Sequence, residues 1–251
     1  MLITPIPAFK DNYIWAITNE QQHTLICVDP GDAAPVLSYT QQNHLQLTSI
    51  LLTHHHPDHC GGVEALLQAF PKLTVYGPPD ARIPNVKIKL SDEDIVHIDS
   101  YGFRVLNIPG HTTSHICFQE PTKAWLFCGD TLFSAGCGRV FDGTMEQLFT
   151  SLQMIKGLPE DTQVFCGHEY TRNNLRFAAE VEPDNEHIRK YAQYLLQHPN
   201  QCSLPSTIAL EKKINPFLRT QDLQNFARLH DIIPEDSLGI FTKLRILKDD
   251  F

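Results

Sequence analysis

The sequence of 251 residues lacks what several classes of protein require. It has no excess of basic charge, because 20 lysines and arginines stand against 29 aspartates and glutamates, for a net charge of −9. Nucleic-acid binding needs a basic surface, so we predict no nucleic-acid partner. No apolar run approaches the ~20 residues that span a bilayer, and residues 1–7 have no basic segment followed by an apolar one. We therefore expect no membrane partner and a cytoplasmic location.

Cysteine chemistry is also limited. The seven cysteines are an odd number and form no Cys-x-x-Cys spacing, which argues against a disulfide framework and for reduced thiols. Apolar residues make up 42% and charged residues 20%, as in an ordinary globular protein rather than a disordered one. Nothing in the sequence requires an oligomer, so we expect a monomer.

The chain changes character near residue 170. Before it, apolar runs predict short strands, several of them apolar on both faces and so buried in a layered α/β fold; they are 25–28, 48–53, 73–76, 103–106, 116–118, 124–127 and 163–165. A turn of Asp, Pro and Gly follows the first of them, at 29–32. Helical spacing is expected at 63–67, 145–158 (capped by Thr144), 174–181, 186–197 and 222–229. We predict an α/β domain over 1–170 and a small helical domain over 171–251.

Residues 53–59, which read Thr-His-His-His-Pro-Asp-His, are the most informative segment. In an extended segment His54 and His56 point to the same side, because side chains alternate. Two imidazoles on one side suit a divalent ion such as zinc. Asp58 and His59 follow a proline that turns the chain, so they can face a second point nearby.

Three further ligand candidates follow apolar runs elsewhere in the chain. His111, Asp130 and His168 each have a glycine directly before them, which lets the backbone bend closely around a shared centre. Ligands of open α/β folds gather beyond the carboxyl ends of strands. A closed structural zinc site would usually use thiolates, so five histidines and two aspartates favour an open, catalytic pair of metals.

The remaining histidines receive no ligand role. His55 lies between two predicted ligands and should point away from them, and its role stays open. His115 is interpreted as a neighbour of the ligands. The others are interpreted as ordinary core or surface residues: His23, His44, His97, His187, His198 and His230.

Several motifs together resemble the glyoxalase II (hydroxyacylglutathione hydrolase) family of the metallo-β-lactamase superfamily. The run at 53–59 resembles the superfamily signature, and the segments 109–112, 128–133, 136–139, 166–171 and 215–219 resemble that hydrolase. The resemblance implies an αββα sandwich followed by a helical domain. It also implies two metal sets joined by a bridging Asp130; they are His54, His56 and His111, and Asp58, His59 and His168.

The resemblance also implies a glutathione thioester as the small-molecule substrate. Arg139 stands where the family has a basic residue, and Tyr170 matches a substrate-contacting tyrosine. Arg245 and Lys248 match the Arg-x-x-Lys element of the tail, which binds the carboxylate end of glutathione. Phe141 departs from the pattern, because some members have Tyr there. Affinity is then expected to be weaker while the chemistry is unchanged.

The expected reaction is hydrolysis of S-D-lactoylglutathione and related S-(2-hydroxyacyl)glutathione thioesters to reduced glutathione and D-lactate, the second step of methylglyoxal detoxification. Two divalent ions lower the pKa of a bridging water towards about 7 and polarise the carbonyl, so no protein nucleophile is needed. Asp58, which would orient the hydroxide, and the bridging Asp130 are the predicted catalytic residues. Zinc suits the ligands best, although iron and manganese tolerate them.

Other activities are open to the same signature. Many β-lactamases place Cys at a second-site ligand position, where this chain has Asp130. A persulfide dioxygenase of the superfamily uses one iron, and the complete second ligand set disfavours it. A metal-holding module without catalysis would have lost ligands, and none is missing from the pattern.

Overall fold

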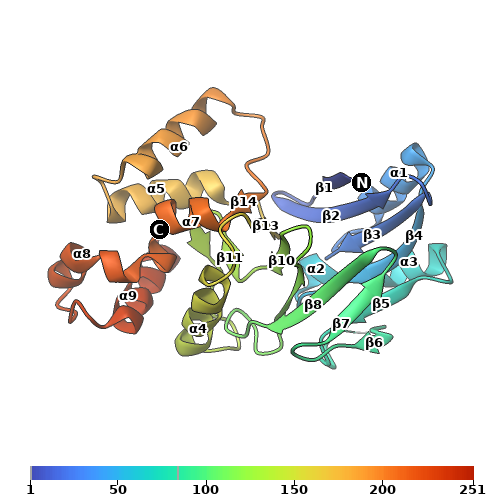
Figure 1. Cartoon of the computed structure of the whole chain (residues 1–251), viewed down its shortest axis with the longest axis horizontal. Coiled ribbons are helices and arrows are strands. Elements are labelled where there is room, and N and C mark those ends of the chain that lie inside the picture. The colour runs from blue at the N-terminus through green and yellow to red at the C-terminus, as the bar shows by residue number, and fades with distance from the viewer. Residues whose placement is uncertain (1, 84) are drawn as a thin grey trace. The chain divides into compact units, whose positions relative to one another are not determined.

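In this computed structural model, which describes residues 2–83 and 85–251, the chain folds into two units (Figure 1). The first unit comprises Met1–Asn107 and Ser114–Gly129, and the second comprises Ile108–Thr113 and Asp130–Phe251. The strands after residue 130 cluster with the C-terminal helices in the second unit.

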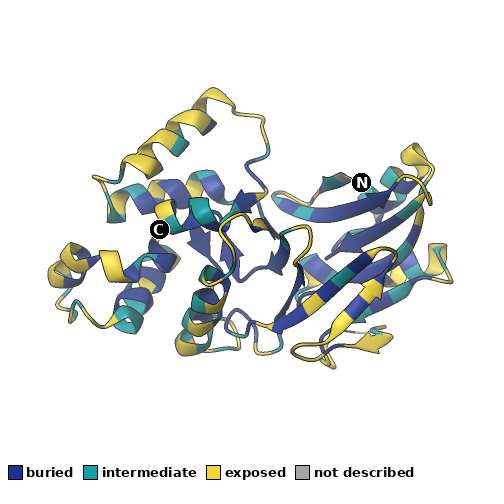
Figure 2. Ribbon diagram, in the orientation of Figure 1, coloured by how far each residue is buried: buried dark blue, intermediate teal, exposed yellow. Residues whose placement is uncertain are grey.

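The first unit begins with a six-stranded sheet in the order β1-β2-β3-β4-β5-β6. The first three strands pair antiparallel and the last four pair parallel. Its strands are β1 (Leu2–Ala8), β2 (Asn12–Asn19), β3 (Thr24–Val28), β4 (Gln46–Leu51), β5 (Thr74–Gly77) and β6 (Ile88–Lys89). Nearly every residue of β2 and β3 is buried (Figure 2). For β3, which covers the predicted run at 25–28, this agrees with the predicted burial on both faces.

The same unit holds four antiparallel strands in the order β7-β8-β9-β10. They are β7 (Ile95–Ile98), β8 (Tyr101–Asn107), β9 (Ile116–Glu120) and β10 (Trp125–Gly129). Every residue of β9 is buried. The backbone N–H of Ile116, at the start of β9, donates to the carbonyl of Thr53 over 3.0 Å, which ties this sheet to the segment after β4.

Helices cover one face of the first sheet. They are α1 (Ala33–Asn43), the single turn α2 (Pro57–Cys60) and α3 (Val63–Ala69). One core cluster joins the sheet to α1 and α3, with Leu25, Ile50, Val36 and Leu66 among its most buried members. Burial of these side chains supplies most of the drive for this layer to form.

The second unit contains two short strand pairs and most of the helices. The strands are β11 (Leu132–Phe133), β12 (Gly136–Cys137), β13 (Gln163–Cys166) and β14 (Ser206–Thr207). The helices are α4 (Met145–Lys156), α5 (Thr171–Val181), α6 (Glu186–Gln197), α7 (Ile208–Ile214), α8 (Gln224–Leu229) and α9 (Ser237–Asp249), with 3-10 turns at Pro216–Leu218 and Thr220–Asp222. Thr144 caps α4 through a complete capping box with Gln147, as the sequence predicted. Strand β14 was not predicted, because a strand of two residues is too short to show an alternating apolar pattern.

All seven cysteines are reduced thiols, which confirms the expectation of no disulfide framework. Five of them lie on strands and are fully buried or nearly so: Cys27, Cys117, Cys128, Cys137 and Cys166. Burial raises the pKa of the Cys117 thiol to about 12 and that of Cys137 to about 11.

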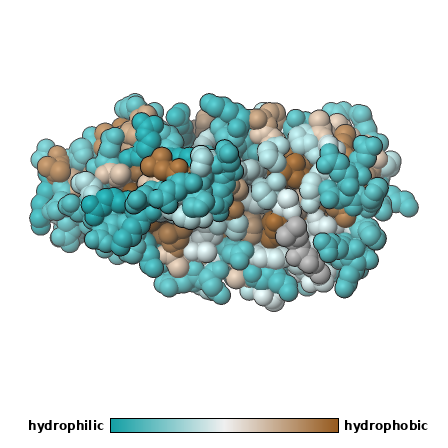
Figure 3. Space-filling model, turned by 90° about the horizontal axis from the view of Figure 1, so that it is seen from above, coloured by the Kyte–Doolittle hydropathy of each residue, from teal (hydrophilic) through white to brown (hydrophobic). Residues whose placement is uncertain are grey.

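Within the described residues, no helix has the length and apolar character that crossing a membrane requires. The face drawn in Figure 3 is mainly hydrophilic, with apolar side chains in separate small patches. Such scattered apolar groups are normal for a protein surface.

Candidate metal centre

The segment after β4 carries the first pair of ligand candidates. Thr53 donates from its backbone N and from Oγ1 to the two carboxylate oxygens of Asp29, over 2.8 and 2.7 Å. A threonine hydroxyl has one hydrogen, so the 2.9 Å contact between Thr53 Oγ1 and His54 Nδ1 is donated by the imidazole. Nε2 of His54 then carries its lone pair and lies 3.1 Å from Nδ1 of His56. The two histidines point to one place, as the sequence predicted.

The second pair of candidates comes from α2. Nδ1 of His59 donates to Oδ2 of Asp29 over 3.1 Å, which leaves the lone pair on Nε2. That Nε2 lies 3.5 Å from Oδ2 of Asp58, so the carboxylate and the imidazole face each other. Asn12 donates to the same Asp58 oxygen over 2.9 Å and fixes the carboxylate. Asp58 and His59 therefore present an oxygen and a nitrogen donor side by side.

Asp29 is the residue of this unit that the sequence interpretation missed. Its carboxylate, His54 and His59 each bring a ligand atom within 4.8 Å of the others. Both Asp29 oxygens already accept hydrogen bonds, so Asp29 supports the ligands rather than joining them. The sequence could have indicated Asp29, because it directly follows the apolar run of β3, and other ligand candidates also follow apolar runs.

The second unit brings its three candidates together. Oδ2 of Asp130 lies 3.2 Å from Nε2 of His168 and 3.7 Å from Nε2 of His111. All three side chains are buried. A carboxylate between two imidazole nitrogens is the arrangement expected of a bridging ligand, and the three predicted residues of this unit do meet.

The backbone around His111 fixes its ring. Nδ1 of His111 donates to the carbonyl of Arg139 over 2.8 Å, so its Nε2 keeps the lone pair that faces Asp130. Gly138 must be glycine, because a Cβ there would lie 2.0 Å from the Asp130 carbonyl oxygen and 2.9 Å from His111 Nδ1. Gly110, directly before His111, has a φ of +141°, in agreement with the predicted bend.

Two aromatic residues predicted to contact substrate lie against the ligands of this unit. The ring of Tyr170 stacks on that of His168, with centroids 4.6 Å apart and planes 8° apart. Phe141 meets the His111 ring edge-on at 5.2 Å and is 64% exposed. Phe141 thus presents an open apolar surface where a tyrosine would present a hydroxyl.

The predicted basic residues gather around one aspartate. Arg139 Nε lies 3.4 Å from Oδ1 of Asp249, and Arg245 Nη2 donates to the same oxygen over 2.9 Å. Arg139 is largely exposed, whereas Arg245 is only 3% exposed and also donates from Nη1 to the Cys137 carbonyl over 2.8 Å. The Arg245 guanidinium thus binds protein groups through both Nη atoms, a placement that the sequence did not predict.

Lys248 lies beside this group. Its Nζ sits 5.5 Å from the centroid of the Phe177 ring and 4.8 Å from that of Phe251. Burial, together with the nearby Arg245 and Arg139 guanidinium groups, lowers the pKa of Lys248 to about 8.

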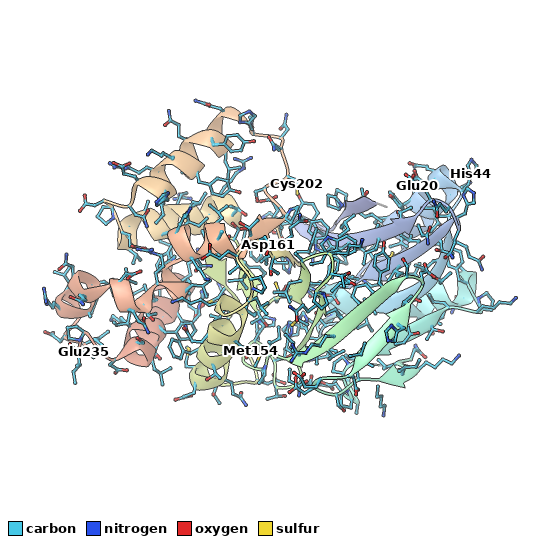
Figure 4. All side chains as sticks on the ribbon, in the orientation of Figure 1. Glu20, His44, Met154, Asp161, Cys202 and Glu235 are labelled. Atoms are coloured by element: carbon cyan, nitrogen blue, oxygen red, sulfur yellow. The ribbon has the colours of Figure 1, made fainter. Side chains whose placement is uncertain are left out.

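The other histidines lie outside these sets. His55 turns to Asp80, with 3.7 Å between Nδ1 and Oδ2, and His115 stacks on the His54 ring at 4.6 Å. His44 caps the end of α1 at an exposed position (Figure 4). Of the six histidines interpreted as ordinary, none joins a His, Cys, Asp or Glu group able to hold a metal within the described part of the chain.

The known proteins that this chain resembles belong to a superfamily of metal-dependent name, which agrees with the cluster of histidine and aspartate side chains. A family model described as metallo-beta-lactamase superfamily matches residues 12–168, and one described as hydroxyacylglutathione hydrolase C-terminus matches residues 169–251. A hydroxyacylglutathione hydrolase of Legionella pneumophila (strain Corby) is 52% identical over 253 residues, covering 100% of both chains. The chain belongs to the hydroxyacylglutathione hydrolase family of the metallo-β-lactamase superfamily.

Solved structures agree with the superfamily fold. ETHE1 from Myxococcus xanthus superposes with a TM-score of 0.69 at 24% identity, covering 97% of this chain and 91% of that one. TTHA1623 in a di-iron-bound form gives a TM-score of 0.61 at 28% identity, covering 86% of this chain and 100% of that one. The predicted α/β metallo-β-lactamase fold with a C-terminal helical region is confirmed.

The donor set fits the metals that this hydroxyacylglutathione hydrolase family member would hold. Imidazole nitrogens and carboxylate oxygens suit zinc, iron and manganese. In His54, His59 and His111, a hydrogen bond from Nδ1 leaves Nε2 as the ligand atom. The rings are thereby oriented before any ion arrives.

Proposed function

We propose that the protein hydrolyses S-D-lactoylglutathione and related S-(2-hydroxyacyl)glutathione thioesters to reduced glutathione and D-lactate. The observation that carries this proposal is the 52% identity, over the full length of both chains, to a protein named hydroxyacylglutathione hydrolase. The geometry supports it independently, because each unit presents several imidazole and carboxylate donors in contact with one another.

The proposed ligands divide into two sets joined by Asp130. His54, His56 and His111 would hold one ion, and Asp58, His59 and His168 the other. Support comes from the incomplete sets within each unit and from the position of Asp130 between two Nε2 atoms. We propose zinc as the metal, while the di-iron form of TTHA1623 shows that a related fold accepts iron.

Two divalent ions held there would activate a water and polarise the thioester carbonyl. The protein residues would then orient the water and the metal ligands. Asp58, fixed by Asn12, would orient the attacking water, and Asp130 would set the spacing of the ligands. The leaving group needs no protein acid, because a thiol pKa of about 8.5 makes the thiolate a good leaving group.

Glutathione recognition is proposed for the basic and aromatic residues of the second unit. Arg139 and Lys248 would pair with its carboxylates, and Tyr170 would contact its peptide part. Phe141 would offer only apolar contact. Arg245 is proposed to contribute its charge, since both of its Nη atoms already bind protein groups.

The test is thioester hydrolysis by purified protein of measured metal content. S-D-lactoylglutathione should release one thiol per molecule hydrolysed, and the rate should follow the metal content and fall when a chelator removes the metal. A protein that carries two metals and releases no thiol would overturn the substrate assignment. Parallel assays with a chromogenic β-lactam, and of oxygen uptake with glutathione persulfide, separate the other activities of the superfamily.

Three further statements remain proposals. We propose that residues 1–170 form a catalytic domain and residues 171–251 a helical substrate-binding domain. We also propose that the protein is a monomer and that it is located in the cytoplasm. Sedimentation of the purified protein tests the monomer, and fractionation of its cells tests the location.

A further inference from the structure

The β11–β12 hairpin is held by side chains from outside it. Its tight turn places Ala135 at a φ of +56°, in the left-handed region that a residue with a Cβ rarely adopts. Such a conformation persists only where the surroundings impose it. The surroundings here are α5, α7 and α9, which contribute Asn174, Glu211, Asn215 and Arg245.

Glu211 is the centre of this contact. Its side chain is fully buried, and its Oε1 accepts from Ser134 Oγ over 2.8 Å and from Ser206 Oγ. Its Oε2 accepts from the Ala135 backbone N over 2.8 Å and from Asn215 Nδ2 over 3.0 Å. A buried carboxylate is costly unless donors surround it, and four donors surround this one.

Asparagine side chains bind the carbonyl groups of the same hairpin. Asn215 Nδ2 also lies 3.1 Å from the Phe133 carbonyl and 2.9 Å from the Gly136 carbonyl, and it shares its two hydrogens among these two oxygens and Glu211 Oε2. Asn174 Nδ2 donates to the Ser134 carbonyl over 3.0 Å. With the bond from Arg245 to the Cys137 carbonyl, the hairpin backbone is fixed from Phe133 to Cys137.

The base of the hairpin leads directly to the metal-ligand candidates. The backbone N of Gly138 donates to the Thr131 carbonyl over 3.2 Å, which closes the hairpin. Asp130 immediately precedes that closure and Arg139 immediately follows it. The Arg139 carbonyl accepts the 2.8 Å bond that orients His111. A shift of the hairpin therefore moves Asp130 and the acceptor for His111 together.

We propose that Glu211 of α7 and Asn215, which caps the end of α7, are positioning residues for the proposed metal ligands Asp130 and His111, acting through the β11–β12 hairpin. The proposal rests on the metal sites of the proposed function, and it does not depend on which thioester is the substrate. A merely structural role would also stabilise the fold, so the test measures zinc binding and thermal stability separately.

The first variant is Glu211→Leu, which keeps about the size of the side chain and removes both acceptor oxygens. The Ala135 N–H and the Asn215 N–H then lose their acceptor on α7, so the hairpin loses one side of its support. We expect zinc affinity, measured by competition with a chromophoric chelator, to fall about tenfold or more, the scale seen when groups that orient metal ligands are removed. The kcat for S-D-lactoylglutathione should fall at an unchanged KM.

Thr207→Ala is the matched control. The Thr207 side chain caps α7 by accepting from the Leu210 N–H over 3.1 Å, and its hydroxyl has no bond to the hairpin. This variant should lower the melting temperature and keep the zinc affinity of the parent. Glu211→Leu with parental zinc affinity overturns the proposal, as does an equal loss of zinc affinity in Thr207→Ala.

Gly136→Ala keeps the test decisive if Glu211→Leu does not fold. A Cβ at Gly136 would lie 2.4 Å from Asn174 Nδ2, so it displaces the hairpin from its own side and leaves α7 unchanged. Weakened zinc binding in this folded variant supports the proposal, and parental binding overturns it. Zinc binding without thioester hydrolysis in the parent protein would overturn the substrate assignment alone.

Discussion

Asp29 and His59 are joined by a hydrogen bond of 3.1 Å between Oδ2 and Nδ1, deep in the first unit. The same Asp29 carboxylate accepts from the Thr53 hydroxyl, which in turn accepts from His54. One carboxylate thereby orients one proposed ligand of each metal set. This makes Asp29 the most informative residue to change outside the ligands themselves.

Asp29→Asn should weaken both metal sites. The amide keeps the shape of the side chain, but its nitrogen cannot accept the bonds that one carboxylate oxygen accepts now. We expect zinc affinity to fall about 10- to 100-fold, measured by chelator competition. Asp32→Asn is the control, since Asp32 caps α1 through Ala34 and Asn caps equally well. Parental zinc affinity in Asp29→Asn would show that ring orientation is set elsewhere.

Asp130→Ala should remove the bridge between the proposed metal sets. We expect the protein to retain about one metal per chain and to lose at least about 100-fold in kcat, the scale of losing one electrostatic stabiliser. Elemental analysis and thiol release on one sample measure both. Asp161→Ala, at an exposed carboxylate of the same unit, should change neither. Near-parental turnover in a metal-quantified Asp130→Ala preparation would contradict the two-metal proposal.

Substrate affinity should depend on pH through Lys248. Its pKa is lowered to about 8, so the ammonium is charged below pH 8 and neutral above it. The KM for S-D-lactoylglutathione should therefore rise between pH 7 and pH 9, by about two- to fivefold for the loss of one partly exposed ion pair. Lys248→Arg stays charged over this range and should flatten the profile. An unaltered rise in Lys248→Arg would assign the titration to another group.

Phe141→Tyr should strengthen substrate binding. The ring is 64% exposed beside His111, so a hydroxyl can be added there without steric cost. One added hydrogen bond is worth roughly 0.5–1.5 kcal/mol, which lowers KM by about two- to tenfold at constant kcat. Steady-state kinetics with Phe141→Leu as the second variant measure this. An unchanged KM in Phe141→Tyr would mean that no peptide group of the substrate reaches this position.

Local patterns predicted part of the regular structure. The helix at 186–197 was predicted with the bounds of α6, and the helix that begins at Met145 with its threonine cap, because apolar spacing and capping are local. Several elements were not predicted, among them β1, β2, α1, α7, α9, β14 and the β11–β12 hairpin. The two-residue strands β11, β12 and β14 are too short to show an alternating pattern, and contacts with distant helices hold the hairpin in place.

The sequence indicated the candidate metal ligands, but it did not indicate the residues that orient them. His54 and His56 share a direction because strand geometry alternates side chains, and that follows from sequence. Asp29 and Glu211 bind partners that lie 24 and 76 residues away in the sequence, and no local pattern encodes such contacts. Arg245 was predicted as a substrate residue from its motif, while its burial depends on the packing of α9.

The buried cysteines have a consequence for a protein proposed to release glutathione. Thiol–disulfide exchange requires a thiolate and access to it. Cys117 and Cys137 stay protonated at neutral pH, because burial raises their pKa values to about 12 and about 11. Oxidised glutathione would therefore form mixed disulfides with them very slowly, and the strands that carry them should resist S-glutathionylation while the protein remains folded.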